Sequence, residues 1–145
     1  MTSHTNEALL RRMYDEAFSK GKLSVVDEVM DRNFVEHEPL PGFKSGVEGL
    51  KQFIGAMRTG FPDLGVAVND LVSQGDKVWT RVTVTGTHKG SFMNIPPTGK
   101  RISFEGIDIV RFSGGKVAEH WGVADSLGLL TQLGVIPPPG QSPEK

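Results

Sequence analysis

Apolar residues in the first half of the chain recur at the spacing of helices. The first such set follows three- and four-residue steps and comprises Leu9, Leu10, Met13, Tyr14, Ala17 and Phe18. This pattern predicts an amphipathic helix that ends at Gly21. Two further helices are expected over residues 24–31 and 46–58, and a brief strand over residues 34–38 that stops before Pro39.

The hydrophobic period changes to two residues in the second half of the chain. Alternating apolar and polar positions predict strands over residues 64–73, 77–87 and 101–112. A tight hairpin then leads into a final strand over residues 115–125, and a short helix is expected over residues 126–134. Helices that precede an antiparallel meander are typical of the α+β class.

The order of these elements predicts one domain with a cone-like shape. Three N-terminal helices packed on a curved antiparallel sheet would leave an apolar throat, which suits a small hydrophobic molecule. We expect this domain to span residues 1–136, with a proline-rich flexible tail over residues 137–145.

The composition of the chain argues against several classes of protein and of functional site. The formal net charge is −1, from 16 basic and 17 acidic residues, so electrostatics give no reason to expect nucleic acid or a membrane as partner. The sequence has no cysteine, which excludes disulfides and thiolate chemistry. The first residues carry several charges and resemble no signal peptide, and no apolar run suits a membrane span. A cytoplasmic location is the expectation.

The long strand over residues 77–87 has two faces, and their orientation decides where a partner could dock. Thr80, Val82 and Val84 share one face, for which Trp121 is a further candidate. We expect this apolar face to lie outside and form a homodimer through the sheet. In the alternative, this same face packs on the helices and the face with Arg81 lies outside.

Asp108 and His120 are the candidate catalytic residues. Asp108 lies on the apolar face of a strand, where a carboxylate is costly unless it is partnered or has a perturbed pKa for catalysis. The hairpin between the last two strands should bring His120 close to it, so an Asp–His pair is expected. The alternative for His120 is a partly exposed strand histidine.

Five further residues are candidates for substrate binding, each with a second interpretation. Arg81 could clamp a carbonyl or carboxyl oxygen if it faces inward, but it is a surface residue if it faces outward. His37 could face the throat or solvent near the rim, and His88 could be a rim or turn residue. Trp121 is more typical of a core or interface position. Asp125 fits a helix N-cap better than a ligand contact.

Several short motifs together resemble one known family over most of the chain. They are Gly60-Phe-Pro-Asp-Leu64, Gln74-Gly-Asp-Lys-Val78, Thr85-Gly-Thr-His-Lys-Gly90, Pro97-Thr-Gly-Lys100, Gly106-Ile-Asp108 and Glu119-His-Trp121. On these motifs the chain is similar to the SnoaL-like polyketide cyclases, also called ester cyclases. The resemblance implies the nuclear-transport-factor-two-like fold.

The resemblance also implies a reaction that needs no metal and no organic cofactor. Family members close a polyketide ester by an intramolecular aldol reaction, which requires a base for a proton alpha to a carbonyl and a donor for the enolate oxygen. Characterised cyclases use an aspartate on the final strand, and the register expected here places Gly122 at that position. A glycine there could open space for a ligand.

Three functions therefore remain open, because this fold carries many activities. The first is acid–base catalysis, by cyclisation or isomerisation, on a small polyketide-like carbonyl or ester compound. The second is a non-catalytic binding or scaffold protein. The third and least favoured is an epoxide hydrolase, which would need Asp108, Asp125 and Arg81 to converge.

Overall fold

A computed structural model describes residues 3–138 and 140–141 of the chain. Its elements, in chain order, are α1 (Ser3–Arg12), the π-helical segment η1 (Met13–Phe18), α2 (Ser24–Val29), β1 (Met30–Glu36), α3 (Gly46–Gly60), β2 (Gly65–Gln74), β3 (Lys77–Thr87), β4 (Arg101–Ser113), β5 (Lys116–Ala124) and α4 (Ser126–Gln132). Every predicted helix and strand is present. The predicted tail falls partly on residues 139 and 142–145, which lie outside the described residues.

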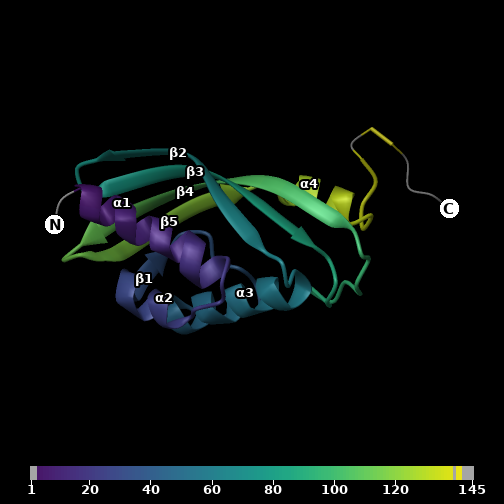
Figure 1. Cartoon of the computed structure of the whole chain (residues 1–145), viewed down its shortest axis with the longest axis horizontal. Coiled ribbons are helices and arrows are strands. Elements are labelled where there is room, and N and C mark those ends of the chain that lie inside the picture. The colour runs from purple at the N-terminus through teal and green to yellow at the C-terminus, as the bar shows by residue number, and fades with distance from the viewer. Residues whose placement is uncertain (1–2, 139, 142–145) are drawn as a thin grey trace.

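The five strands form one bent sheet in the order β1-β5-β4-β3-β2. Strands β2 to β5 form the expected antiparallel meander. Helices α1, α2 and α3 lie along one face of the sheet, as Figure 1 shows. The predicted α+β cone is therefore confirmed, and the sheet positions residues from its concave face against the helices.

Strand β1 departs from the predicted antiparallel pattern, because it pairs parallel to β5. Parallel neighbours cannot be joined by a hairpin and need a long crossover, which the chain from α3 to β4 provides here. The pairing places Glu36 opposite His120. The brief N-terminal strand thus lies directly beside the strand that carries a candidate catalytic residue.

The first helix is not regular along its whole length. Its second half is the π-helical segment η1, which buries Met13, Tyr14 and Ala17. The apolar spacing predicted one continuous helix and gave no sign of this wider turn. π-helical turns recur at functional sites, and this one carries the chain's single tyrosine.

The predicted outer face of the sheet is wrong, and the alternative is correct. Thr80 and Val82 are each 3% exposed, and Val84 packs against the core beneath the helices. Arg81 alternates with them and lies on the opposite, exposed face. Burying the valine face against three amphipathic helices removes more apolar surface from water than leaving it outside would.

The interior consists of two apolar clusters. The larger cluster joins α1, η1 and α2 to the middle of the sheet and includes Val25, Val78 and Val117. The smaller cluster, at the other end, includes Phe61 and Ile102. Among the described residues, no helix is long and apolar enough to cross a membrane.

Two glycines of α3 provide a test of this packing. A methyl group on Gly49 would collide with the carbonyl oxygen of Lys44, whereas one on Gly55 would meet nothing within 4 Å. We therefore expect Gly49→Ala to destabilise the fold by roughly 1–3 kcal/mol and Gly55→Ala to stabilise it by about 0.5–1 kcal/mol. Urea denaturation measures both changes, and equal effects of the two substitutions would contradict the described path of residues 44–49.

Candidate functional site

Asp108 lies on the concave face of β4, between Thr80 on β3 and Gly122 on β5 in the strand register. Its Oδ1 lies 2.8 Å from Nε2 of His120, and its Oδ2 accepts a hydrogen bond of 2.7 Å from the hydroxyl of Tyr14. The Asp108 side chain is 25% exposed to solvent. The predicted Asp108–His120 contact is therefore confirmed, and the carboxylate is held from two sides without being sealed off.

His120 is shared between two carboxyl groups. Its Nδ1 lies 2.7 Å and 2.8 Å from the two oxygens of Glu36, while its Nε2 faces Asp108. A neutral imidazole can donate only one hydrogen bond, but an imidazolium donates from both nitrogens. Two carboxylate acceptors on opposite sides of the ring therefore favour the protonated form.

The same contacts determine the pKa of His120. Burial lowers the pKa, but the hydrogen bonds to Asp108 and Glu36 and their negative charges outweigh it and raise the pKa from 6.5 to about 9. At neutral pH the ring is therefore an imidazolium between the carboxylates of Glu36 and Asp108. His120 is therefore better suited to hold and stabilise a carboxylate than to accept a proton.

Tyr14 extends the network into the core. Its hydroxyl lies 2.7 Å from Oγ1 of Thr80 and donates to Asp108, so the Thr80 hydroxyl is left to donate to Tyr14. Burial, and next the negative charge of Asp108, raise the pKa of Tyr14 well above its ordinary value. Tyr14 thus remains a hydrogen-bond donor over the whole physiological pH range.

Sequence reasoning missed three members of this cluster: Tyr14, Glu36 and Thr80. Tyr14 was one of six apolar positions on a helix, and Glu36 lay between Val35 and His37 on a short predicted strand. The one available signal was chemical, since a tyrosine on a buried helix face needs a partner for its hydroxyl. The parallel pairing that brings Glu36 to His120 has no local signature in the sequence.

Arg81 and Asp125 lie outside this cluster. Arg81 is on the exposed face of the sheet, where its guanidinium binds Asp70 and Glu105 at 2.7 Å each. Asp125 caps α4 by accepting a hydrogen bond of 2.8 Å from the backbone N–H of Gly128. Their predicted binding roles stay predictions, and the N-cap interpretation of Asp125 agrees with the structure.

His37 and Trp121 belong to a second cluster, of stacked rings and charged side chains, on the exposed face of the sheet. Their rings stack with centroids 4.7 Å apart, and His37 Nε2 lies 2.8 Å from Oε2 of Glu119. Arg111 donates to the same carboxylate at 2.6 Å, and Lys77 lies over the indole. Glu119 and Trp121 flank His120 in β5, so their side chains point away from the concave face.

His88 is not at a rim or turn surface, as predicted, but is fully buried. Its Nδ1 accepts a hydrogen bond of 3.2 Å from the backbone N–H of Thr98, and its ring lies 5.3 Å from that of Phe61. The prediction failed because residues 88–100 fold back over the ring, with backbone hydrogen bonds from His88 to Lys100 and from Gly99 to His88.

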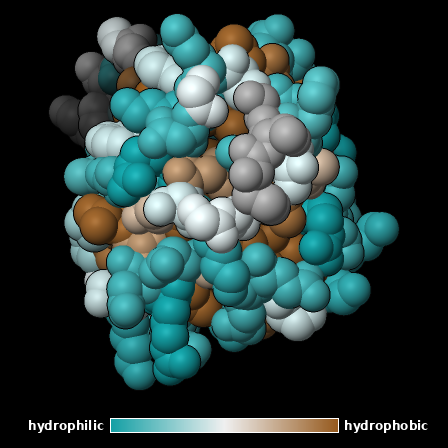
Figure 2. Space-filling model, turned by 90° about the vertical axis from the view of Figure 1, so that its left-hand side faces the viewer, coloured by the Kyte–Doolittle hydropathy of each residue, from teal (hydrophilic) through white to brown (hydrophobic). Residues whose placement is uncertain are grey.

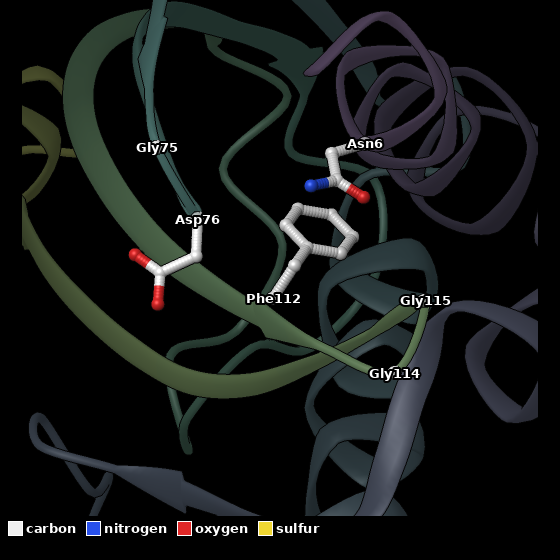
Figure 3. Close-up of a pocket in the computed structure, with 6 residues that line it drawn as sticks. All are labelled: Asn6, Gly75, Asp76, Phe112, Gly114 and Gly115. Atoms are coloured by element: carbon white, nitrogen blue, oxygen red, sulfur yellow. The ribbon is translucent and has the colours of Figure 1, made fainter. Parts of the chain in front are cut away.

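Among the hollows on the described part of the surface, two have neither Asp108 nor His120 in their lining. One of about 270 Å³ lies at the hairpin-turn end and is lined by Asn6, Gly75, Asp76, Phe112, Gly114 and Gly115. Figure 3 shows the Asn6 side chain beside the Phe112 ring, and Figure 2 shows this end of the molecule as a largely hydrophilic surface with separate apolar patches. The other, of about 290 Å³, lies on the exposed face of the sheet beside Arg81.

No three His, Asp or Glu side chains of the described residues are grouped to hold a metal ion. Glu36 and Asp108 contact opposite nitrogens of the His120 ring, so the three groups do not converge on one point.

Comparisons with known proteins identify the family of this chain. The model of a family described as SnoaL-like polyketide cyclase matches residues 8–133. The chain is 31% identical to the aklanonic acid methyl ester cyclase DauD of Streptomyces sp. strain C5, over 87% of this chain and 80% of that protein. It is 28% identical to the nogalonic acid methyl ester cyclase of Streptomyces nogalater, over 81% of this chain and 90% of that protein.

A solved structure is similar over nearly the whole domain. TsrD from Streptomyces laurentii superposes with a TM-score of 0.85 at 30% identity, covering 94% of this chain and 99% of TsrD. The bent sheet with its acid–base cluster thus defines a domain of the nuclear-transport-factor-two-like class. Within that class, the chain belongs to the SnoaL-like polyketide cyclase family.

The shared imidazole predicts a specific dependence of stability on pH. Because the pKa of His120 rises from 6.5 to about 9 on folding, its contribution is complete below pH 6.5 and is lost as the pH rises through 9. We expect the free energy of unfolding to fall over this interval by up to about 3 kcal/mol more in the natural protein than in His120→Gln.

Urea denaturation at a series of pH values measures this difference. His37→Gln is the matched control, since it removes an exposed histidine on the other face and should keep the dependence. Equal pH dependence in His120→Gln and the natural protein would show that the two carboxylates do not hold the imidazolium.

Proposed function

We propose that this protein is an acid–base enzyme in which Asp108 is the general base and His120 stabilises the negative charge that develops. The observation that carries the proposal is the Asp108 carboxylate, which is held by the Tyr14 hydroxyl at 2.7 Å and by His120 at 2.8 Å and is still 25% exposed. A positioned and partly accessible base is what proton abstraction next to a carbonyl requires.

The first chemical step is proton transfer. Asp108 takes a proton from the carbon alpha to a substrate carbonyl, and the bonding electrons move into an enolate. As the carboxylate is neutralised, its hydrogen bond with His120 weakens. The Nε2 proton of His120 then becomes available to the enolate oxygen, while Glu36 keeps the ring charged through Nδ1.

The second step returns the proton. In an aldol closure the enolate carbon attacks a second carbonyl carbon of the same molecule, and the new alkoxide takes the proton that Asp108 had accepted. In an isomerisation the proton returns to a different carbon. Either sequence leaves the enzyme unchanged and balances without a redox or group-transfer partner, consistent with a cofactor-independent reaction.

The substrate class rests on the relatives. Two of them are cyclases of aklanonic acid methyl ester and nogalonic acid methyl ester. We propose a polyketide-like methyl ester with an acidic hydrogen between carbonyl groups, bound between the sheet and the helices. The partly buried rings of Phe18, Phe53 and Phe104 supply apolar surface on that side.

Removing the base should slow catalysis strongly while the protein remains folded. We expect Asp108→Asn to lower kcat/KM for an aromatic polyketide methyl ester by about 10²–10⁴-fold, because the amide cannot accept the proton. Asp15→Asn, at an exposed carboxylate of η1, is the matched control and should retain activity. Cyclised product is measured by chromatography, with circular dichroism to check the fold.

A non-catalytic binding protein is the second candidate. It is favoured by one observation, since both His120 nitrogens are already bound to carboxylates and offer no free donor in the resting state. Tight binding of the ester with no turnover in the natural protein would replace the enzyme proposal by this one. Epoxide hydrolysis is less well supported, because Arg81 and Asp108 lie on opposite faces of the sheet.

We also propose a homodimer through the exposed face of the sheet. Val72, Trp79, Ile109 and Trp121 form one row across the four strands, and Ile107 lies opposite Val123 in a neighbouring row. Several of these side chains are strongly exposed, from 43% for Ile107 to 66% for Val123. Pairing two such faces would remove this apolar surface from water.

Size-exclusion chromatography with light scattering measures the mass of the protein in solution and so tests the dimer. We expect about twice the chain mass of 15.8 kDa, and the single-chain mass for Ile107→Lys, since the charge would lie inside the interface. Met93→Lys, at an exposed apolar residue of the loop between β3 and β4, is the control and should stay dimeric. A single-chain mass for the natural protein would refute the interface.

A further inference from the structure

We infer that Gly122 is a positioning residue, whose missing side chain allows His120 to reach Asp108. This inference deepens the proposed function, because it concerns how the proposed base and its partner are brought together. Gly122 lies directly opposite Asp108 in the pairing of β4 and β5, two residues beyond His120 on the same strand and face.

The geometry leaves no room for a side chain at this position. A Cβ atom on Gly122 would lie 2.8 Å from Oδ1 of Asp108, 2.9 Å from Cε1 of His120 and 3.0 Å from its Nε2. The three contacts are with the two groups that form the hydrogen bond, and none is with backbone. Even an alanine would therefore have to displace the carboxylate, the imidazole or both.

The space beside Gly122 is thus already occupied. A glycine on the concave face could have enlarged a ligand site, but here the Asp108–His120 pair fills the volume that a side chain would take. His120 is two residues away from the position facing Asp108, so its ring has to lean along the strand over residue 122. Only glycine leaves that path clear.

Gly106 provides a matched comparison. It lies on β4 two residues before Asp108, and its pairing with Val82 places it on the same face. A Cβ atom there would meet its nearest neighbours at 3.4–3.8 Å, which is ordinary contact. Alanine at residue 106 therefore adds the same methyl group to the same face without touching the pair.

An NMR titration of the His120 ring in the substrate-free protein tests the inference. We expect a pKa of about 9 in the natural protein and in Gly106→Ala, and a value displaced toward 6.5 in Gly122→Ala. A pKa that stays near 9 in Gly122→Ala would overturn the inference. Since no substrate is present, this result does not depend on whether Asp108 is the base of a reaction.

A double-mutant cycle covers the case in which Gly122→Ala does not fold. In the His120→Ala background the ring is gone and Asp108 can move, so adding Gly122→Ala should cost much less stability than it does in the natural protein. Folding of the double variant when Gly122→Ala alone fails would support the inference. An equal cost in both backgrounds, or failure of the double variant when His120→Ala folds, would overturn it.

The kinetic consequence follows if the proposed function is correct. Gly122→Ala should lower kcat more than it raises KM and should shift the pH profile, because the pair is disturbed while the apolar surface is not. Unchanged catalysis together with a displaced His120 pKa would refute the proposed function and leave the positioning role of Gly122 intact.

Discussion

The imidazole of His120, held between Glu36 and Asp108, is the interaction on which the rest of the site depends. Its charge lets two carboxylates lie within hydrogen-bond distance of one ring at a partly buried position. Without the cation the two carboxylates would repel each other and each would lose one of its hydrogen-bond donors, and burial would make that arrangement costly. The cluster is therefore stable as a unit, and its members cannot be exchanged independently.

The backbone explains why the cluster has this form. The parallel pairing of β1 with β5 brings Glu36 beside His120, and the antiparallel register of β4 with β5 places Gly122 opposite Asp108. The π-helical segment η1 directs Tyr14 from the helical layer toward the carboxylate. These two strand pairings and the π-helical segment together bring the side chains within hydrogen-bond distance of one another.

The periodicity of the sequence located the helices and strands but only half of the site. Helical spacing and two-residue alternation located every element, and the cost of a carboxylate on an apolar face pointed to Asp108. The same alternation separated a valine-rich face of β3 from a face with Lys77, Trp79 and Arg81. It could not say whether the apolar face packs on the helices or on a second copy of the chain, because either arrangement removes that face from water. Glu36 could not be identified, since its partner is 84 residues away along the chain.

The wide helical turn at η1 has a consequence for when the hydrogen-bond network can form. Its tyrosine lies near one end of the chain and His120 near the other, so only a fragment that runs from Tyr14 to His120 contains the whole hydrogen-bond network. The network can form only when the first helix docks on a completed sheet. The complete network should therefore be among the last features to form during folding and among the first to be lost when the N-terminal helices loosen.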